Sequence, residues 1–187
     1  MAALSEKFDE AFQFAAEVHR QQKRKGTEVP YLTHLMAVAA LVGEHGGDEE
    51  QMIAALLHDA MEDQGVTREE LVQRFGARVA TIVEDCTDST AQPKPPWRER
   101  KEGYVAHLRQ AGPETRLVSV ADKVHNARSI LSDLRTEGPT IWKRFTAGPQ
   151  EILWYYHALL EAFRSGWAHP LVDELERVVR EMERLQR

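Results

Sequence analysis

The sequence contains almost no cysteine: Cys86 is the only one among 187 residues. An internal disulfide and a cysteine-rich zinc site are therefore both excluded. The sequence also lacks any run of 18 apolar residues, which argues against a transmembrane helix. The N-terminal segment MAALSEKFDEAF carries acidic residues and no apolar stretch of the kind found in a secretory signal. We therefore expect a cytoplasmic protein.

Basic residues are fewer than acidic residues, with 24 lysines and arginines against 30 aspartates and glutamates. The formal net charge is −6 and the isoelectric point is about 5.8. This balance provides no general attraction to nucleic acid or to anionic membrane, so we expect a small-molecule partner and no extended nucleic-acid surface. Hydrophobic residues make up 42% and charged residues 29% of the chain, which is typical of a folded globular protein. The length predicts a single domain over residues 1–187.

Patterns typical of β-strands are absent, and apolar residues recur at helical spacing along nearly the whole chain. We predict an all-α bundle of roughly eight to ten helices. They are expected at about 5–26, 31–46, 48–63, 67–76, 77–86, 97–111, 114–136, 149–165 and 170–186, with a short helical piece between 138 and 149. Residues 87–97 contain three prolines and predict a loop. The last helix carries an apolar seam for another helix, within the chain or across a dimer, so the expected state is a monomer or a homodimer.

Four ionisable residues follow directly on the apolar run 53–57. They are His58, Asp59, Glu62 and Asp63. Charge buried at the end of an apolar helix is costly unless it is paired or bound to a metal. His34 and Asp122 each lie in an apolar, helix-like segment of their own. Two imidazoles and two carboxylates form a ligand set for a hydrolytic divalent metal and suit Mn²⁺, Fe²⁺, Co²⁺ or Zn²⁺.

The two further carboxylates have a separate expected role. Residues four apart share a helix face, so Glu62 lies one turn beyond His58. There Glu62 and its neighbour Asp63 are placed to handle the proton of a water molecule. The alternative is that His58 and Asp59 are only a polar pair at a helix end. A His-Asp dipeptide by itself favours that alternative, but the accompanying histidine and carboxylates favour a metal site.

Candidate substrate residues lie in two segments. Asn126 follows Asp122 by one turn, and Arg128 and Ser129 come next along the same helix. They predict substrate contacts, and a solvated stripe is the alternative. Arg24 and Lys25 could hold a phosphate or stack on a base, or they could be ordinary cations at a helix end.

Other polar residues remain open. His125 is equally consistent with a partner of a metal ligand and with a core histidine. The segment KPPWRERK, residues 94–101, is either a flap over an anionic ligand or an exposed basic helix start. The remaining histidines, including His19, have no partner at a recognisable spacing and are expected to be structural.

These residues and their order resemble the HD-domain hydrolases of the Rel/SpoT class, and in particular the small stand-alone, metazoan-SpoT-like alarmone hydrolases. The resemblance covers roughly residues 5–135 and leaves the C-terminal helices, about 139–187, unexplained. It is carried by FAAEVHRQQKRKGTEVPYLTHLMAVA, AALLHDAMEDQGVT, FGARVATIVEDCTD and VSVADKVHNARSIL.

The resemblance implies an HD-type phosphohydrolase domain. The residues that match the family's metal ligands, usually of Mn²⁺, are His34, His58, Asp59 and Asp122. Those matching its water-activating carboxylates are Glu62 and Asp63, and those matching its nucleotide site are Arg24, Lys25, Asn126 and, more loosely, Ser129. The family reaction removes the 3′-pyrophosphate of guanosine tetra- or pentaphosphate, giving GDP or GTP.

Some positions depart from the family pattern. Leu35 follows the first metal histidine where proline is frequent, Asp88 follows Thr87 where the long enzymes have lysine, and Lys123 replaces a common arginine. These departures leave open other substrates, namely the 2′-phosphate of NADPH and 3′-pyrophosphorylated tRNA. A further alternative is a nucleotide sensor that binds without turnover.

Overall fold

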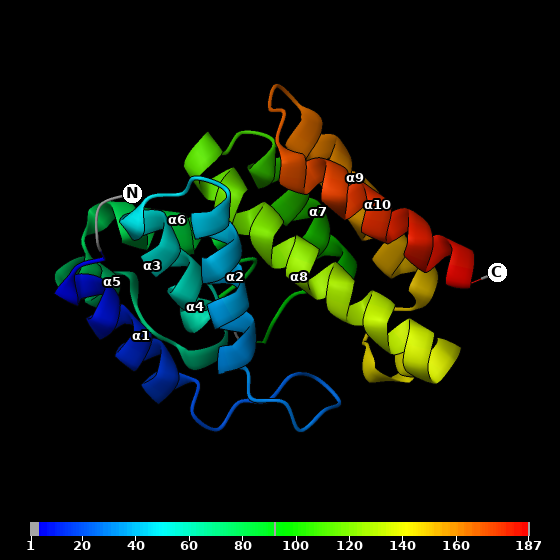
Figure 1. The fold of residues 1–187 in the computed structure, drawn as a ribbon, viewed down its shortest axis with the longest axis horizontal. Helices are drawn as coiled ribbons and strands as arrows, with labels where there is room; N and C mark the ends of the chain where they lie inside the picture. Colours follow the sequence, from blue (N-terminus) through cyan, green and yellow to red (C-terminus); the bar gives the residue numbers. More distant parts are fainter. Residues whose placement is uncertain (1–3, 92, 187) are drawn as a thin grey trace.

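A computed structural model describes residues 4–91 and 93–186 of the chain. Within these ranges the protein is built of helices and has no β-strand, only an isolated bridge between Lys23 and Pro30. The all-α prediction is therefore confirmed (Figure 1). The helices are α1 (Glu6–Val18), α2 (Leu32–Glu44), α3 (Glu49–Leu57), α4 (Ala60–Gln64), α5 (Arg68–Phe75), α6 (Ala77–Cys86), α7 (Trp97–Leu108), α8 (Pro113–Glu137), the 3₁₀-helix η1 (Gly138–Arg144), α9 (Pro149–Arg164) and α10 (Pro170–Leu185).

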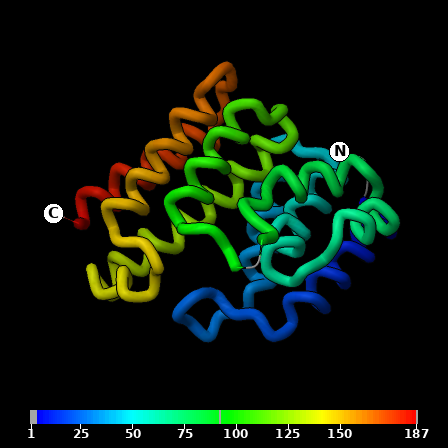
Figure 2. Tube along the Cα trace, turned by 180° about the vertical axis from the view of Figure 1, so that it is seen from behind, coloured from blue at the N-terminus to red at the C-terminus, as the bar shows by residue number. Residues whose placement is uncertain are grey.

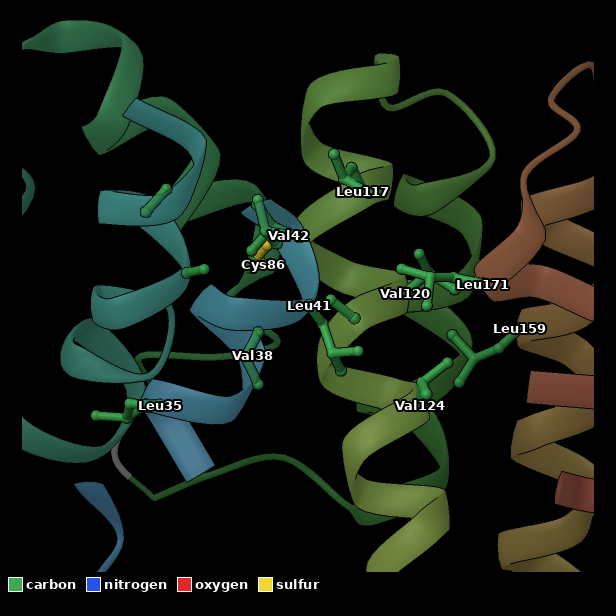
Figure 3. Close-up of a cluster of buried hydrophobic side chains, with 14 of the residues drawn as sticks. Leu35, Val38, Leu41, Val42, Cys86, Leu117, Val120, Val124, Leu159 and Leu171 are labelled. Carbon is green, nitrogen blue, oxygen red and sulfur yellow. The ribbon is translucent and has the colours of Figure 1, made fainter. Parts of the chain in front are cut away.

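Helix α8 lies at the centre of the molecule (Figure 1), with α1 to α6 on one side and α9 and α10 on the other. In Figure 3, Leu41 of α2 lies between its own helix and α8, and Val120 and Val124 of α8 point toward Leu159 and Leu171. All five side chains are buried. Apolar residues on two opposite sides of α8 thus join the N-terminal and C-terminal helices into one core.

The first helix is shorter than the sequence predicts. We expected it to continue to about residue 26, but α1 ends at Val18. Residues 20–31 form a loop instead, closed by hydrogen bonds from the Arg24 amide to the Val29 carbonyl (2.8 Å) and from the Tyr31 amide to the Gln22 carbonyl (2.9 Å). Gly26 takes a positive φ of 72° at the turn, a conformation that glycine adopts at little cost. The chain therefore reverses here, and residues 29–31 run back beside residues 22–24 into the start of α2.

The predicted helix over 48–63 is interrupted at His58 and Asp59. Helix α3 ends at Leu57, Asp59 has φ −101° and ψ 0°, and α4 begins at Ala60. The predicted box formed by Asp48 and Gln51 caps α3 at its other end. In an unbroken helix the side chains of His58 and Asp59 would point about 100° apart. The interruption turns both of them toward the interior.

The C-terminal helices pack within the chain. Leu171, Leu175 and Met182 of the predicted seam on α10 are buried, and α10 packs against α8 and α9. None of the helices in the described part of the chain combines the length and the apolar character needed to cross a membrane.

Candidate active site

The four expected metal ligands converge from three separate parts of the chain. His34 comes from the first turn of α2, His58 and Asp59 from the break between α3 and α4, and Asp122 from the middle of α8. His34 Nε2 lies 3.2 Å from Asp122 Oδ1, and His58 Nε2 lies 3.0 Å from Asp59 Oδ2. The cross distances are 3.8 Å from His34 to Asp59 and 3.7 Å from His58 to Asp122. Ligand atoms about 2.1 Å from one ion and at least 90° apart are separated by about 3 Å or more. The ligand atoms of His34, His58 and Asp59 all lie within 4.8 Å of one another, a spacing that fits a single ion, and Asp122 lies beside both imidazoles.

The ring nitrogens present lone pairs to the space between the ligands. His58 Nδ1 donates to the Ala55 carbonyl at 2.8 Å, which leaves Nε2 without a proton in the neutral ring. Within the described residues, the buried Nε2 atoms of His34 and His58 have no hydrogen-bond partner. Buried nitrogens without partners, facing two carboxylates, are what a divalent cation would satisfy. The residues present therefore fit a metal.

His125 contacts the candidate ligand His34, which favours the first of the two alternatives left open for it. Its Nδ1 lies 2.8 Å from Nδ1 of His34, and the ring centroids are 4.8 Å apart. Burial, with the nearby His34 and Arg24, lowers the pKa of His125 to about 4, so this ring is neutral. A neutral His125 accepts the Nδ1 proton of His34 and fixes the ring with Nε2 toward the other ligands.

The two ligand carboxylates are held by neighbours. Tyr31 Oη donates to Asp59 Oδ2 at 2.5 Å, and the Lys123 ammonium lies 2.5 Å from Asp122 Oδ2. The Asn126 amide donates to Asp122 Oδ1 at 2.5 Å. Burial by itself raises the pKa of Asp122, but the Lys123 ammonium outweighs it and holds that pKa well below its usual range. Asp122 is thus anionic, as a candidate metal ligand must be.

Glu62 and Asp63 of α4 line a cavity of about 240 Å³ together with Asp59 and Asp122. Burial raises the pKa of both Glu62 and Asp63, and the neighbouring carboxylates add to this effect. The Lys94 ammonium lies 2.7 Å from Glu62 Oε1. The structure therefore places the two expected proton-handling carboxylates beside the candidate metal ligands.

A second cavity of about 390 Å³ adjoins the first. The residues that line both are Tyr31, Lys101, Lys123, Asn126 and Tyr155. The cations that line the larger cavity are Arg24, Lys25, Arg100, Lys101, Lys123 and Arg144. The loop over residues 20–31 and helix η1 lie on the same side of the molecule (Figures 1 and 2) and contribute to this wall. The cavity is suited to an anionic ligand.

Four of the five expected substrate residues line the larger cavity, and one does not. Arg24, Lys25, Asn126 and Ser129 are part of its wall, and Arg24 donates to the Asn126 carbonyl oxygen at 2.8 Å. The structure does not bring Arg128 to the others, because its guanidinium pairs with Glu174 of α10 and lies outside both cavities. Arg128 lies two residues beyond Asn126 on α8, so its side chain is rotated by about 200° around the helix axis from that of Asn126.

The segment 94–101 contributes to the site. Trp97, Arg100 and Lys101 line the larger cavity, and Asp88 holds both cations, at 2.5 Å from Arg100 and 2.6 Å from Lys101. Sequence reasoning missed the parts played by Tyr31, Lys123 and Arg144. Tyr31 and Lys123 could have been found from their positions close in sequence to the candidate ligands His34 and Asp122. No feature of the sequence marks Arg144 of η1.

Comparison with known proteins agrees with this geometry. The HD domain family profile matches residues 11–153. A mouse protein named guanosine-3′,5′-bis(diphosphate) 3′-pyrophosphohydrolase MESH1 is 36% identical over 177 residues, which is 93% of this chain and 87% of the relative. The protein of the same name from Xenopus tropicalis is 42% identical over 124 residues, covering 65% of this chain and 68% of the relative.

Solved structures show the same similarity. One, described as a metazoan orthologue of SpoT that hydrolyses ppGpp and plays a role in starvation responses, superposes with a TM-score of 0.78 at 28% identity, covering 97% of this chain and 98% of that one. A Listeria monocytogenes protein gives 0.72 at 31% identity, covering 79% of this chain and 96% of that one. The chain therefore belongs to the HD-domain family, in the group that includes the small MESH1 hydrolases.

Proposed function

We propose that the protein is a Mn²⁺-dependent hydrolase that removes the 3′-pyrophosphate from guanosine tetra- or pentaphosphate, giving GDP or GTP. The relatives named above act on this class of nucleotide. The observation that carries the proposal is the continuity between the two cavities. The smaller cavity is lined by Asp59 and Asp122, and it shares five wall residues with the larger cavity and its cations. A polyphosphate can therefore reach the candidate metal site while its nucleoside occupies the larger cavity. We also propose that residues 1–187 act as one HD-type domain.

The ion would be held by His34, His58, Asp59 and Asp122. When bound, a divalent cation supplies Lewis-acid activation of a water molecule and of the phosphoryl group. Oxygen and imidazole ligands suit Mn²⁺, and Fe²⁺, Co²⁺ and Zn²⁺ fit the same donor set. Asn126 connects the candidate metal site to the larger cavity, because it donates to Asp122 and accepts from Arg24.

Glu62 and Asp63 orient the attacking water and accept its proton. Their raised pKa values bring proton affinity closer to neutral pH than an ordinary carboxylate would offer. The water oxygen attacks the phosphorus bonded to the ribose 3′ oxygen, and the bond between that oxygen and phosphorus breaks. Pyrophosphate leaves, and the 3′ oxygen takes up a proton.

The cations of the larger cavity bind the rest of the nucleotide. Arg24 and Lys25 of the loop over 20–31, with Asn126 and Ser129 of α8, form part of its wall. A guanidinium can bind a phosphate in a bidentate manner or stack on a base, so Arg24 is suited to either contact. Arg24→Ala is expected to raise KM, and Arg128→Ala, outside both cavities, is its matched control.

The test is pyrophosphate release from guanosine tetraphosphate in the presence of Mn²⁺, beside an Asp59→Ala variant. Release of pyrophosphate and GDP by the wild type, lost in the variant, is the expected result. Absence of release from folded, metal-loaded protein would overturn the proposal. Parallel incubations with NADPH and with 3′-pyrophosphorylated tRNA then identify a different substrate, and tight nucleotide binding without turnover identifies a sensor.

A further inference from the structure

A polar cluster of three residues lies behind the carboxylates of α4, next to the loop over 20–31. His19, only 2% exposed, has Nδ1 2.5 Å from the Gln22 side-chain oxygen. The Gln64 amide donates to the same oxygen at 2.6 Å. The Gln22 amide nitrogen in turn donates to Asp63 Oδ2 at 2.7 Å. The proposed reaction uses Asp63 but assigns no role to the other three.

The hydrogen bonds determine which way the Gln22 amide faces. Its oxygen accepts two donors, Nδ1–H of His19 and the amide of Gln64. Reversing the amide would place its NH₂ group against the Gln64 NH₂ group and its oxygen against the Asp63 carboxylate, leaving donors facing donors and acceptors facing acceptors. An ionised Asp63 carboxylate can only accept, so it fixes the Gln22 NH₂ group toward itself, and donors on His19 and Gln64 match the Gln22 oxygen that faces them.

We propose that His19, Gln22 and Gln64 are positioning residues that hold the Asp63 carboxylate in the orientation needed to handle the proton of the attacking water. This inference rests on the proposed function, in which Asp63 has that role. The Gln22 backbone is fixed independently, because its amide donates to the His19 carbonyl at 3.0 Å and its carbonyl accepts from Tyr31 at 2.9 Å. The side chain is thus presented from a rigid loop.

The His19 ring contributes a hydrogen-bond donor to the cluster in addition to filling space. Within the described residues its buried Nε2 has no hydrogen-bond partner, a cost that an apolar ring would avoid. The ring also stacks on Tyr31, with centroids 5.6 Å apart and planes 26° apart, and Tyr31 donates to Asp59. One ring therefore supports both a proton-handling carboxylate and a ligand carboxylate.

The first test replaces the Gln22 amide by an apolar chain of similar length. Gln22→Met is expected to lower kcat for guanosine tetraphosphate on the order of 10-fold, the size of effect seen when residues supporting an active-site group are removed. KM and Mn²⁺ affinity are expected to stay unchanged, because Gln22 contacts Asp63 and neither a metal ligand nor the larger cavity. Gln21→Met, the same change at the exposed neighbouring residue, is the matched control.

Two further comparisons show that the effect passes through Asp63. In an Asp63→Asn background, measured at high enzyme concentration, Gln22→Met is expected to cause no additional loss of kcat. His19→Phe keeps the ring but removes the donor and should lower kcat. His19→Asn returns an amide N–H close to the position of Nδ1 and should recover most of the loss.

The outcomes separate the two proposals. If the wild type releases no pyrophosphate, the proposed function falls and this inference falls with it. If the wild type is active and Gln22→Met retains the kcat of Gln21→Met, the positioning role alone is overturned. A loss that appears in KM or Mn²⁺ affinity, or one that persists in full in the Asp63→Asn background, also overturns it.

Discussion

Tyr31 links the loop over 20–31 to the candidate metal site through a single hydroxyl. That hydroxyl donates to Asp59 Oδ2, and burial beside this carboxylate raises the pKa of Tyr31, so it remains a protonated donor. Tyr31→Phe removes the donor and keeps the ring. We expect Mn²⁺ to bind on the order of 10-fold more weakly, as measured by calorimetric titration. The control is Tyr104→Phe, whose hydroxyl bonds to Ser119 and not to a ligand. Equal Mn²⁺ affinity in both variants would contradict this role.

The candidate metal ligands stand out in the sequence, whereas the residues that would orient them do not. His34, His58, Asp59 and Asp122 are chemically conspicuous because each is ionisable in an apolar segment. His125 has the same appearance whether it supports a ligand or fills the core, and only its 2.8 Å contact with His34 distinguishes the two. Arg128 shows the opposite case, because it lies near the candidate ligands in sequence while its guanidinium pairs with Glu174 of α10.

At the scale of the element, Gly26 allows the loop over 20–31 to lie against Arg144 of η1. A Cβ at Gly26 would lie 2.6 Å from Arg144 Cδ, and its φ is 72°. Gly26→Ala should therefore displace Arg144 from the larger cavity and raise KM for guanosine tetraphosphate.

Gly65→Ala is the matched control for this change. Its φ is 68°, but a Cβ there would meet nothing within 4 Å. Each variant should lose about 1–2 kcal/mol of unfolding free energy, the cost of a left-handed residue with a Cβ, measured by urea denaturation. An unchanged KM in Gly26→Ala, or an equal rise in both variants, would refute the effect on Arg144.

Asp88, two residues beyond the end of α6, is held to α7 by its side chain. Burial by itself raises the pKa of Asp88, but Lys101 and Arg100 outweigh it and hold the pKa below its usual value. A depressed carboxyl pKa contributes stability above the pKa of the unfolded chain, about 3.9, and this stability is lost as the pH falls through the folded-state value. Asp88→Asn should lower the unfolding free energy at pH 7 by roughly 1–3 kcal/mol. The difference from wild type should shrink below about pH 4. Urea unfolding across this range is the measurement, and a constant difference would contradict the assignment.

The helix boundaries show where sequence patterns reach their limit. The predicted segments over 67–76, 77–86 and 149–165 match α5, α6 and α9 closely, because capping residues and prolines mark their ends. The break at His58 and Asp59 has no such marker. It is set by tertiary contacts, since both side chains meet His34 and Asp122 from other helices. Local periodicity cannot show a break that distant residues impose.

The whole molecule is acidic, yet its larger cavity is walled by cations. The net charge of −6 gives no hint of this distribution. Arg24, Arg100 and Arg144 come from three segments separated by more than forty residues each, and only the packing around α8 brings them together. The sequence therefore predicts the general class of ligand less well than the metal site, because charge gathered across the fold does not appear as a local motif.

Metal binding should also be measurable as stability of the whole molecule. A ligand that binds only the folded state adds about 2.7 kcal/mol of unfolding free energy at 100 times its Kd. Mn²⁺ should therefore raise the Tm of the wild type, whereas His58→Ala, which removes a ligand nitrogen, should abolish most of that rise. His157→Ala is the control, because its ring is half exposed and pairs with Glu183 on the C-terminal helix. Calorimetric scans with and without Mn²⁺ decide between these results. An equal rise in Tm for both variants would place the bound ion outside the four-residue site.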